Sequence, residues 1–285
     1  MSIIEVKNLT KYYGDSKALN DISLSLDENK FYGLLGRNAA GKTTLINIIT
    51  NKIFASSGEV LVCGESSYEN DKVLSDIFYM MERTLYPEGL RISEIFKWTK
   101  KFYSDFDMEY ANNLAAKFEL DTKKKVKQLS TGYTSIFKLI VAMASRAKIL
   151  IFDEPVLGLD ANHREMFYRE LIALYEEKPC TIIISTHLID EIAEVIEEVI
   201  IIKKGELLLK KSVEDLLESA YTVSGEDEKV DAYVKNRNVI SVETMGRFKS
   251  VTITDDNKDK KLADELSIDI GKVDLQKLFI QLTKS

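Results

Sequence analysis

A glycine-rich loop near the N-terminus constrains this chain more than any other feature. Residues 36–43 have the sequence Gly-Arg-Asn-Ala-Ala-Gly-Lys-Thr, which fits the pattern G-x-x-x-x-G-K-[ST]. The apolar run 30–35 before it predicts a buried strand, and the apolar spacing in 44–49 after it predicts a helix. A loop of this pattern between a strand and a helix is typical of a phosphate-binding loop. The alternative, a glycine-rich turn with an incidental lysine, is disfavoured by both flanking elements.

The chemistry of such a loop depends on the start of its helix. There the unpaired backbone N–H groups and the positive end of the helix dipole face bound phosphates. We expect Lys42 to reach the β- and γ-phosphates of a nucleotide, and Thr43 to place its hydroxyl on Mg²⁺. The predicted nucleotide-binding residues of the loop are Gly36, Arg37, Asn38, Ala39, Ala40, Gly41, Lys42, Thr43 and Thr44.

A second segment, residues 149–154, ends an apolar run with two acids. Four consecutive apolar residues suit a central parallel strand that is covered on both faces. Ligands of such sheets bind beyond the carboxyl ends of the strands, where Asp153 and Glu154 lie. We expect Asp153 to hold Mg²⁺ through water and Glu154 to act as the general base toward the attacking water. The alternative, a strand that merely ends in solvated acids, is disfavoured by the phosphate loop.

Composition narrows the class of protein. The 285 residues allow one large domain and one small one. The net charge of −7 provides no electrostatic footprint for nucleic acid. Cys63 and Cys180 lie in or beside apolar runs, so we interpret them as buried thiols in a reducing compartment rather than as a disulfide. Neither a signal peptide nor an apolar stretch of roughly 18–20 residues is recognisable, so we expect a cytoplasmic protein that reaches a membrane only through a partner.

Periodicity predicts the order of elements along the chain. Most elements alternate between strand and helix, and the character changes after residue 211 to short strands with a final helix. We therefore predict two domains, residues 1–214 and a small α+β domain of residues 215–285. The expected strands are residues 3–9, 21–26, 59–63, 77–80, 149–153, 181–185, 199–202, 240–244 and 250–253, and the expected helices are two within 92–118, then 133–147, 161–176, 190–198 and one through 275–282.

A third segment connects these features to a family. Residues 129–133, Leu-Ser-Thr-Gly-Tyr, stand directly before a predicted helix. Together with the phosphate loop and the two acids, they make residues 3–210 resemble the ATP-binding subunit of an ABC transporter, whose usual signature is L-S-G-G-Q. The resemblance implies an α/β fold, a P-loop NTPase of ABC type with a RecA-like core, an antiparallel β subdomain and a helical subdomain. The small C-terminal α+β domain follows it.

The resemblance also implies roles for single residues, with ATP and Mg²⁺ as the ligands. His187 matches the switch histidine, and Asp160 in Gly-Leu-Asp matches the D-loop. Tyr13 matches the aromatic residue that stacks on adenine, with Tyr12 as its nearest rival. Glu82 matches the Gln or Glu that joins nucleotide and metal to the transporter.

Ser130 and Gly132 belong, in the family, to the site of a second subunit, where two ATP molecules lie between two cassettes head to tail. The alternatives from the residues alone are a simple helix N-cap for Ser130, a core aromatic for Tyr13 and an exposed acid for Glu82. His163 is expected to be a solvated surface residue.

Some positions depart from the family pattern. Ala39 replaces a glycine, and its Cβ predicts strain where the backbone approaches phosphate. Thr131 and Tyr133 alter the signature, and Leu157 replaces a serine. None of these changes removes a group needed for hydrolysis, so we expect an active ATPase.

The leading functional hypothesis is the motor subunit of a bacterial ABC exporter, similar to the bacitracin-resistance and peptide-export branch. It would work peripherally on the inner face of the cell membrane, with separate transmembrane permease subunits and a second ATP-binding subunit, identical or related. Glu82, the exposed Leu and Tyr within residues 85–90, and the helices of 92–118 are expected to meet those permeases.

Two other functions stay open. A non-transport ABC ATPase usually has two cassettes in one chain or long coiled-coil insertions, and neither is recognisable here. A nucleotide-sensing regulatory module would not need Glu154 and His187.

Overall fold

The computed structural model describes residues 1–255 and 258–284. The chain divides into two units, residues 1–187 with 200–209, and residues 188–199 with 210–285. Each unit contains a hydrophobic cluster of its own.

An antiparallel sheet forms from the N-terminal strands, as residues 3–9, 21–26 and 59–63 predict. In spatial order its strands are β2 (Ser16–Asp27), β1 (Ser2–Tyr13), β4 (Ser57–Val62) and β5 (Glu65–Ser66). The central strand β1 pairs with both β2 and β4. Ile4 and Val6 are buried whereas Lys7 is exposed, because successive side chains of a strand point to opposite faces.

A six-stranded sheet carries the expected site. Its strands in spatial order are β10 (Glu206–Ser212), β9 (Glu198–Lys203), β3 (Phe31–Leu35), β8 (Thr181–Ser185), β7 (Ile149–Asp153) and β6 (Ile77–Met80). The pairs β3–β8, β8–β7 and β7–β6 are parallel. Every residue of β3, β7 and β8 is buried, as expected for strands covered on both faces. The carboxyl ends of these strands therefore meet at one edge of the sheet, where ligands of such sheets bind.

A two-residue turn, Lys204 and Gly205, joins β9 to β10. Lys204 and Gly205 both have positive φ, 51° and 81°, as the favoured two-residue hairpin turns require.

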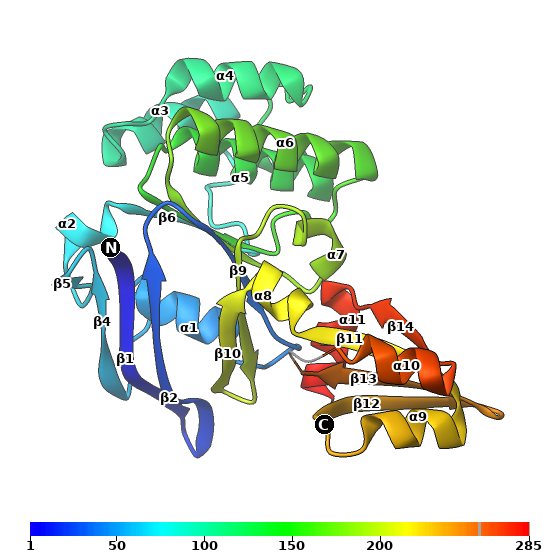
Figure 1. Ribbon diagram of the computed structural model, residues 1–285. Coiled ribbons are helices and arrows are strands. Elements are labelled where there is room, and N and C mark those ends of the chain that lie inside the picture. Colours follow the sequence, from blue (N-terminus) through cyan, green and yellow to red (C-terminus); the bar gives the residue numbers. More distant parts are fainter. Residues whose placement is uncertain (256–257, 285) are drawn as a thin grey trace. The chain divides into compact units, whose positions relative to one another are not determined.

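Helices pack on the sheets of this unit. They are α1 (Lys42–Ile49), α2 (Asp71–Leu74), α3 (Ile92–Phe102), α4 (Met108–Lys117), a 3₁₀ turn (Val126–Gln128), α5 (Thr131–Ala144) and α6 (Ala161–Glu177). Figure 1 shows α3, α4, α5 and α6 grouped together, away from the antiparallel sheet. The two amphipathic helices expected within 92–118 are confirmed as α3 and α4, and α3 buries Ile92, Ile95, Phe96 and Thr99.

The helix after the glycine-rich loop connects the two sheets. Leu45 and Ile49 of α1 share one hydrophobic cluster with Ile4 of β1 and Ile151 of β7. This packing holds the N-terminus of α1, and with it the loop, at the edge of the parallel sheet.

The second unit is α+β, as residues after 211 predict. Its elements are α7 (Ile189–Ile192), α8 (Val213–Glu218), β11 (Ala220–Glu226), α9 (Asp227–Val234), β12 (Val239–Met245), β13 (Phe248–Thr254), α10 (Lys260–Leu266), β14 (Asp269–Lys272) and α11 (Leu275–Thr283). The antiparallel sheet has the order β12-β13-β11-β14. Its cluster includes Tyr221 and Val223 of β11, Val251 of β13 and Tyr233 of α9.

One predicted helix, residues 190–198, is wrong over most of its length. The helix α7 has only four residues, Ile189–Ile192, turns follow it, and Glu198 already belongs to β9. Glu194 and Glu197 would lie at the carboxyl end of a longer helix, where the dipole disfavours negative charge. The apolar spacing alone did not show this electrostatic limit.

Both cysteines are free thiols, but only Cys180 is buried. The expectation that Cys63 is buried is wrong, because Cys63 follows β4 in a turn, with φ of 52°. In residues 1–255 and 258–284, no helix combines the length and apolar character needed to cross a membrane.

Candidate active site

The glycine-rich loop joins β3 to α1 at the carboxyl edge of the parallel sheet, as predicted. Gly41 is the N-cap of α1 and has φ of 112°, a conformation that favours glycine. A Cβ at Gly41 would lie 2.8 Å from Leu19 Cδ2 and 2.9 Å from the carbonyl oxygen of Ala18. Only glycine therefore allows the loop to close against β2.

Ala39 stands in the same loop with a positive φ of 63°. For an L-residue with a Cβ, this left-handed conformation costs roughly 1–2 kcal/mol. The strain expected from the sequence at Ala39 is therefore present as a left-handed backbone conformation.

Lys42 is the first residue of α1, and its side chain is buried beside the loop. Its ammonium donates a hydrogen bond of 2.7 Å to the carbonyl oxygen of Gly36. Burial lowers the pKa of Lys42, and the carboxylates of Glu154 and Asp153 raise it by a smaller amount. A partly desolvated cation next to a helix N-terminus favours an anionic ligand.

A hollow of about 440 Å³ opens over the loop. Besides loop residues, it is lined by a segment of β2 and by the β9–β10 turn, which the sequence reasoning missed. Its lining residues are Ser16, Lys17, Ala18, Ala39, Ala40, Gly41, Lys42, Thr43, Thr44, Lys204 and Gly205. Lys17 and Lys204 add two cationic side chains to a space that is large enough for phosphate groups. No local pattern identifies them, because each reaches the loop only through strand pairing.

Asp153, at the end of β7, is buried and held by three hydroxyl groups. Its carboxylate accepts hydrogen bonds from Ser185 Oγ at 2.8 Å, Thr43 Oγ1 at 3.2 Å and Tyr79 Oη at 3.3 Å. Burial, followed by the charges of Asp153 and Glu82, raises the pKa of Tyr79 above its ordinary value, so that this phenol stays a donor. The structure therefore brings Thr43 and Asp153 together, as predicted.

Glu154 has a strained backbone and a carboxylate fixed at both oxygens. Its φ is 49°, and its N–H donates to the carbonyl oxygen of Ser185 at 2.8 Å. Oε2 accepts a hydrogen bond of 3.0 Å from the Thr186 hydroxyl, and Oε1 lies 2.9 Å from His187 Nδ1. Strain of this kind persists where surrounding contacts over-determine it, and it is frequent at active sites. Glu154 and His187, 33 residues apart, thus form one pair.

Glu82 follows β6, and its side chain is exposed. Its carbonyl oxygen accepts a hydrogen bond of 2.6 Å from the ammonium of Lys138 on α5. Burial lowers the pKa of Lys138, whereas the charges of Glu82 and Asp153 raise it. The sequence reasoning missed Lys138, because a lysine in an apolar helix pattern ordinarily indicates a solvated face.

The segment after Glu82 only partly matches the expectation of an exposed Leu and Tyr. Leu85 is 61% exposed, but the ring of Tyr86 packs edge-on against Phe137 at 4.8 Å. Burial raises the pKa of Tyr86. The expected exposed tyrosine is therefore wrong, because α5 provides an aromatic surface that covers it.

Ser130 and Gly132 lie at the start of α5, where Gly132 approaches the segment after Pro155. Ser130 is the N-cap, with its Oγ accepting from the N–H of Tyr133 at 3.3 Å. A Cβ at Gly132 would lie 2.8 Å from the carbonyl oxygen of Gly158, so this close approach requires glycine. These contacts form a group separate from the one around Lys42 and Asp153.

Asp160 caps α6 and binds the histidine that was expected to be solvated. Its carboxylate accepts from the N–H of His163 and lies 2.9 Å from His163 Nδ1, and these two hydrogen bonds lower the pKa of Asp160. The His163 ring stacks on Phe118 at 6.1 Å and meets Tyr133 edge-on at 6.2 Å. His163 is half-buried rather than fully solvated, because Phe118 after α4 and Tyr133 of α5 bring aromatic rings to it.

Tyr13 lies at the end of β1 and is 50% exposed, so it is not a core aromatic. The ammonium of Lys11 lies 5.2 Å from the centre of the Tyr13 ring. Its rival Tyr12 contacts Lys17, which lines the hollow over the loop, with 5.3 Å from ammonium to ring centre. The stacking of Tyr13 on adenine stays a prediction. Its test must include both Tyr12 and Tyr13.

The oxygen atoms around Thr43 and Asp153 suit Mg²⁺. Hydroxyl and carboxylate oxygens are the ligands this ion prefers, and it usually binds through one or two carboxylates, several waters and substrate phosphates. Among the residues that the structure describes, no three His, Cys, Asp or Glu side chains cluster as a metal site.

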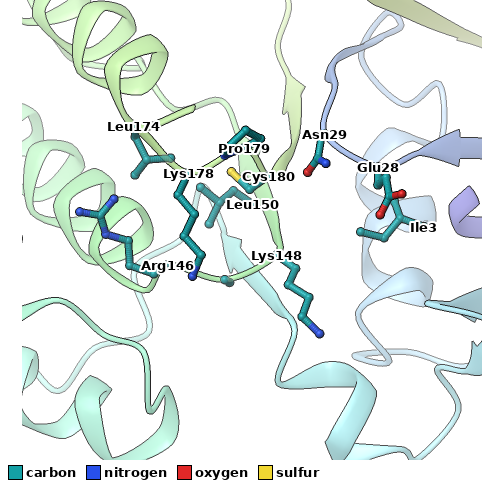
Figure 2. Close-up of a pocket in the computed structure, with 11 residues that line it drawn as sticks. Ile3, Glu28, Asn29, Arg146, Lys148, Leu150, Leu174, Lys178, Pro179 and Cys180 are labelled. Atoms are coloured by element: carbon teal, nitrogen blue, oxygen red, sulfur yellow. The ribbon is translucent and has the colours of Figure 1, made fainter. Parts of the chain in front are cut away.

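Another hollow, of about 100 Å³, lies where β7 and β8 begin, at the opposite edge of the sheet (Figure 2). Lys148 and Cys180 line it, but its cations have carboxylate neighbours. Arg146 contacts Asp107 at 3.1 Å, and Lys148 contacts Asp76 at 2.9 Å. This hollow therefore does not compete with the loop as an anion site.

The chain is similar in sequence to known proteins. The family model described as ABC transporter matches residues 19–157. The ABC transporter ATP-binding protein YtrB of Bacillus subtilis is 28% identical over 260 residues, which cover 91% of this chain and 89% of YtrB. The ABC transporter ATP-binding protein MJ1023 of Methanocaldococcus jannaschii is 33% identical over 75% of this chain and 79% of its own length. This chain is a member of the ABC transporter ATP-binding family.

As a member of the family, this ABC ATPase binds ATP and hydrolyses it as the ATP-binding subunit of a transporter. The bacitracin transport ATP-binding protein BcrA of Bacillus licheniformis is similar to it, with 32% identity over 73% of this chain and 69% of BcrA. Among solved structures, an ATP-binding subunit of an ABC transporter matches with a TM-score of 0.70 at 22% identity, covering 75% of this chain and 92% of that one. The predicted fold class is thereby confirmed.

Proposed function

We propose that this ABC ATPase is the motor subunit of a bacterial exporter and works as an ATP-sandwich dimer on separate membrane subunits. The observation that carries the proposal is the meeting of Thr43, Asp153, Glu154 and His187 at one sheet edge, linked by contacts of 2.9–3.2 Å. Export, rather than transport in general, is supported by its similarity to proteins named for bacitracin and lantibiotic transport.

The loop binds the phosphates in this proposal. Backbone N–H groups of residues 36–44 and the ammonium of Lys42 hold the β- and γ-phosphates of ATP. Thr43 and Asp153, with the carboxylate of Glu82, would hold Mg²⁺. When bound, the metal neutralises phosphate charge. Adenine stacks on Tyr13.

Hydrolysis then depends on how the chain holds Glu154. This carboxylate accepts a proton from the attacking water, whose oxygen bonds to the γ-phosphorus as the bond to the β–γ bridging oxygen breaks. ADP and inorganic phosphate leave. Thr186 and His187 keep both carboxylate oxygens oriented toward the water.

A second cassette completes each site. Ser130 and Gly132 stand at the N-terminus of the 14-residue helix α5, where backbone N–H groups and the helix dipole favour an anion. We infer that they face the γ-phosphate bound to the partner cassette, and that Asp160 lies beside them at the interface. The partner is a second copy or a related chain.

The membrane subunits meet residues 82–90 and the helices α3 and α4, with Leu85 as the most exposed apolar residue of that segment. In this proposal the protein works peripherally on the inner face of the cell membrane. Residues 1–214 form the cassette and residues 215–285 form an accessory domain. The match to YtrB covers 91% of this chain, which supports an accessory domain with a role in both proteins.

One experiment tests the transporter assignment. The chain with Leu85→Cys, in a Cys63→Ser and Cys180→Ala background, is purified with a tag from detergent-solubilised membranes. A transmembrane protein should co-purify and cross-link through position 85, with a yield that differs between ATP-bound and nucleotide-free states. A matched Lys258→Cys variant in the accessory domain should not cross-link to it. ATP turnover without any membrane partner would instead favour a non-transport ATPase.

A further inference from the structure

The middle of α5 contains a buried lysine that hydrolysis itself does not use. Lys138 is 5% exposed, and its neighbours Phe137 and Leu139 are fully buried. Its ammonium donates to the carbonyl oxygen of Met81 at 3.0 Å and to that of Glu82 at 2.6 Å. Both carbonyls belong to the backbone that directly follows β6.

Burying this ammonium carries a cost that an alkyl side chain would avoid. Desolvation disfavours a buried charge unless hydrogen bonds compensate it. The two carbonyl contacts provide that compensation, and hydrogen bonds from a charged donor are stronger than neutral ones. The role of the charge is therefore to hold the backbone of residues 81 and 82 through these two hydrogen bonds.

An aromatic contact beside Lys138 fixes the same segment. Phe137, the preceding residue of α5, packs against Tyr86 at 4.8 Å in an edge-on arrangement. Residues 81–86 thus rest on two consecutive residues of one helix, one through polar bonds and one through rings.

The N-terminal part of α5 is fixed to a different segment. Ser135 donates a hydrogen bond of 2.9 Å to the carbonyl oxygen of Leu157, and Gly132 lies against Gly158. A helix of this length behaves as a rigid rod on the scale of its turns. Displacement of its N-terminus therefore displaces Lys138 and the backbone bound to it.

We propose that Lys138 is a positioning residue that locks the backbone of Met81 and Glu82 to α5. Residues 81–86 and the helix start at Ser130 and Gly132 then move as one body. The inference rests on the proposed function for its consequence: ATP-driven closure on the partner cassette, felt at the start of α5, is passed to the segment that meets the membrane subunits. The lock itself consists only of contacts within this chain.

The lock is tested by pulsed electron paramagnetic resonance on the full-length, nucleotide-free chain. Spin labels are attached at Arg83→Cys and Thr131→Cys, with Cys63→Ser and Cys180→Ala. Lys138→Met should broaden the distance distribution about twofold, because a released segment samples locally open states. Lys138→Gln removes the charge with less apolar bulk and should broaden it as well, so a folding defect of the Met variant does not leave the question open.

Two controls separate the lock from general loosening. Lys148→Met removes a lysine that contacts Asp76 where β6 and β7 begin, whereas residues 81 and 82 follow the other end of β6. This variant should leave the distance distribution narrow. A label pair at Lys97→Cys and Thr131→Cys, within the helical group, should stay narrow in every variant. An unchanged 83–131 distribution in both Lys138 variants would overturn the lock.

ATP hydrolysis gives the second readout. Without the cysteine labels, Lys138→Met should lower kcat about tenfold with little change in KM for ATP, since a displaced catalytic neighbourhood costs rate rather than binding. A raised KM with unchanged kcat would contradict a positioning role. If the wild-type chain hydrolysed no ATP, the proposed function would fail, while the distance measurement would still decide the lock.

Discussion

Nδ1 of His187 lies 2.9 Å from Oε1 of Glu154, and Thr186 occupies the other carboxylate oxygen at 3.0 Å. The base is therefore oriented by two neighbours on the adjacent parallel strand's extension. These two contacts hold the carboxylate of Glu154, whose backbone is strained, in one orientation.

The first prediction concerns this pair. Glu154→Gln should lower turnover by about 10²–10⁴ while ATP still binds, because the general base is lost and the loop is intact. His187→Ala should lower turnover by a smaller factor, since the base keeps its Thr186 contact. Steady-state hydrolysis and nucleotide affinity, measured side by side, check both. Near-normal turnover of Glu154→Gln would remove Glu154 from the role of base.

Lys42→Met should reduce function and yet stabilise the nucleotide-free chain. It removes the cation for the β- and γ-phosphates, so ATP affinity should fall and turnover stop. It also removes a charge whose pKa burial lowers from 10.5. Calorimetric unfolding at several pH values, together with ATP titration, measures both effects.

The pH dependence of that stability gain has a definite sign. A lysine whose pKa is lowered in the folded state binds more protons when unfolded, so it destabilises the fold fully below its folded pKa. The advantage of Lys42→Met should therefore be constant below the folded pKa and shrink as pH rises from the folded pKa toward 10.5. An advantage that grew over this range would contradict the buried, protonated lysine.

Ala39→Gly should stabilise the chain by about 0.5–1 kcal/mol, because release of left-handed strain exceeds the entropy that glycine adds to the unfolded state. Ala40→Gly is the matched control in the same loop, where φ is not positive, and it should destabilise by about 0.5–1 kcal/mol. Denaturant unfolding without nucleotide gives both values. Equal signs for the two variants would show that φ at position 39 is not the cause.

Assigning the adenine stack to Tyr13 or to Tyr12 leads to opposite predictions for ATP affinity. If Tyr13 stacks on the base, Tyr13→Ala should weaken ATP affinity by roughly 1–3 kcal/mol, and Tyr12→Ala should weaken it much less. Neither should change the affinity for inorganic triphosphate, which has no base. The reverse order for ATP would assign the stack to Tyr12, whose ring already contacts Lys17 of the hollow.

ATP should drive self-association of Glu154→Gln, in which bound ATP persists. A ligand that bridges two chains stabilises the dimer by mass action. Sedimentation should show a dimer with ATP and a monomer without it, and Ser130→Arg should prevent the dimer by crowding the interface. Lys148→Arg, just before β7 at the sheet edge opposite the phosphate loop, serves as the control. A monomer in mixtures that include the native partner cassette would refute the sandwich.

The parts of this protein that could be predicted from its sequence are those that depend on local interactions. The sequence of residues 36–43 predicts a turn and a helix start, and the apolar run before Asp153 predicts a buried strand. The apolar spacing in 92–118 predicts two amphipathic helices. Each of these features depends on residues that are close together in the sequence, so the segment itself contains the information that predicts it. The order of these segments was also enough to show the fold and the family.

Only the tertiary structure decided which distant side chains meet. Lys138 reaches the carbonyls of Met81 and Glu82, Tyr79 reaches Asp153, and Lys17 reaches the hollow across strand pairing. Glu154 and His187 were each predicted, but their 2.9 Å contact depends on the register of β7 against β8. The physical reason is that hydrogen bonds, burial and charge act over a few ångströms in space, and separation along the chain says little about that distance.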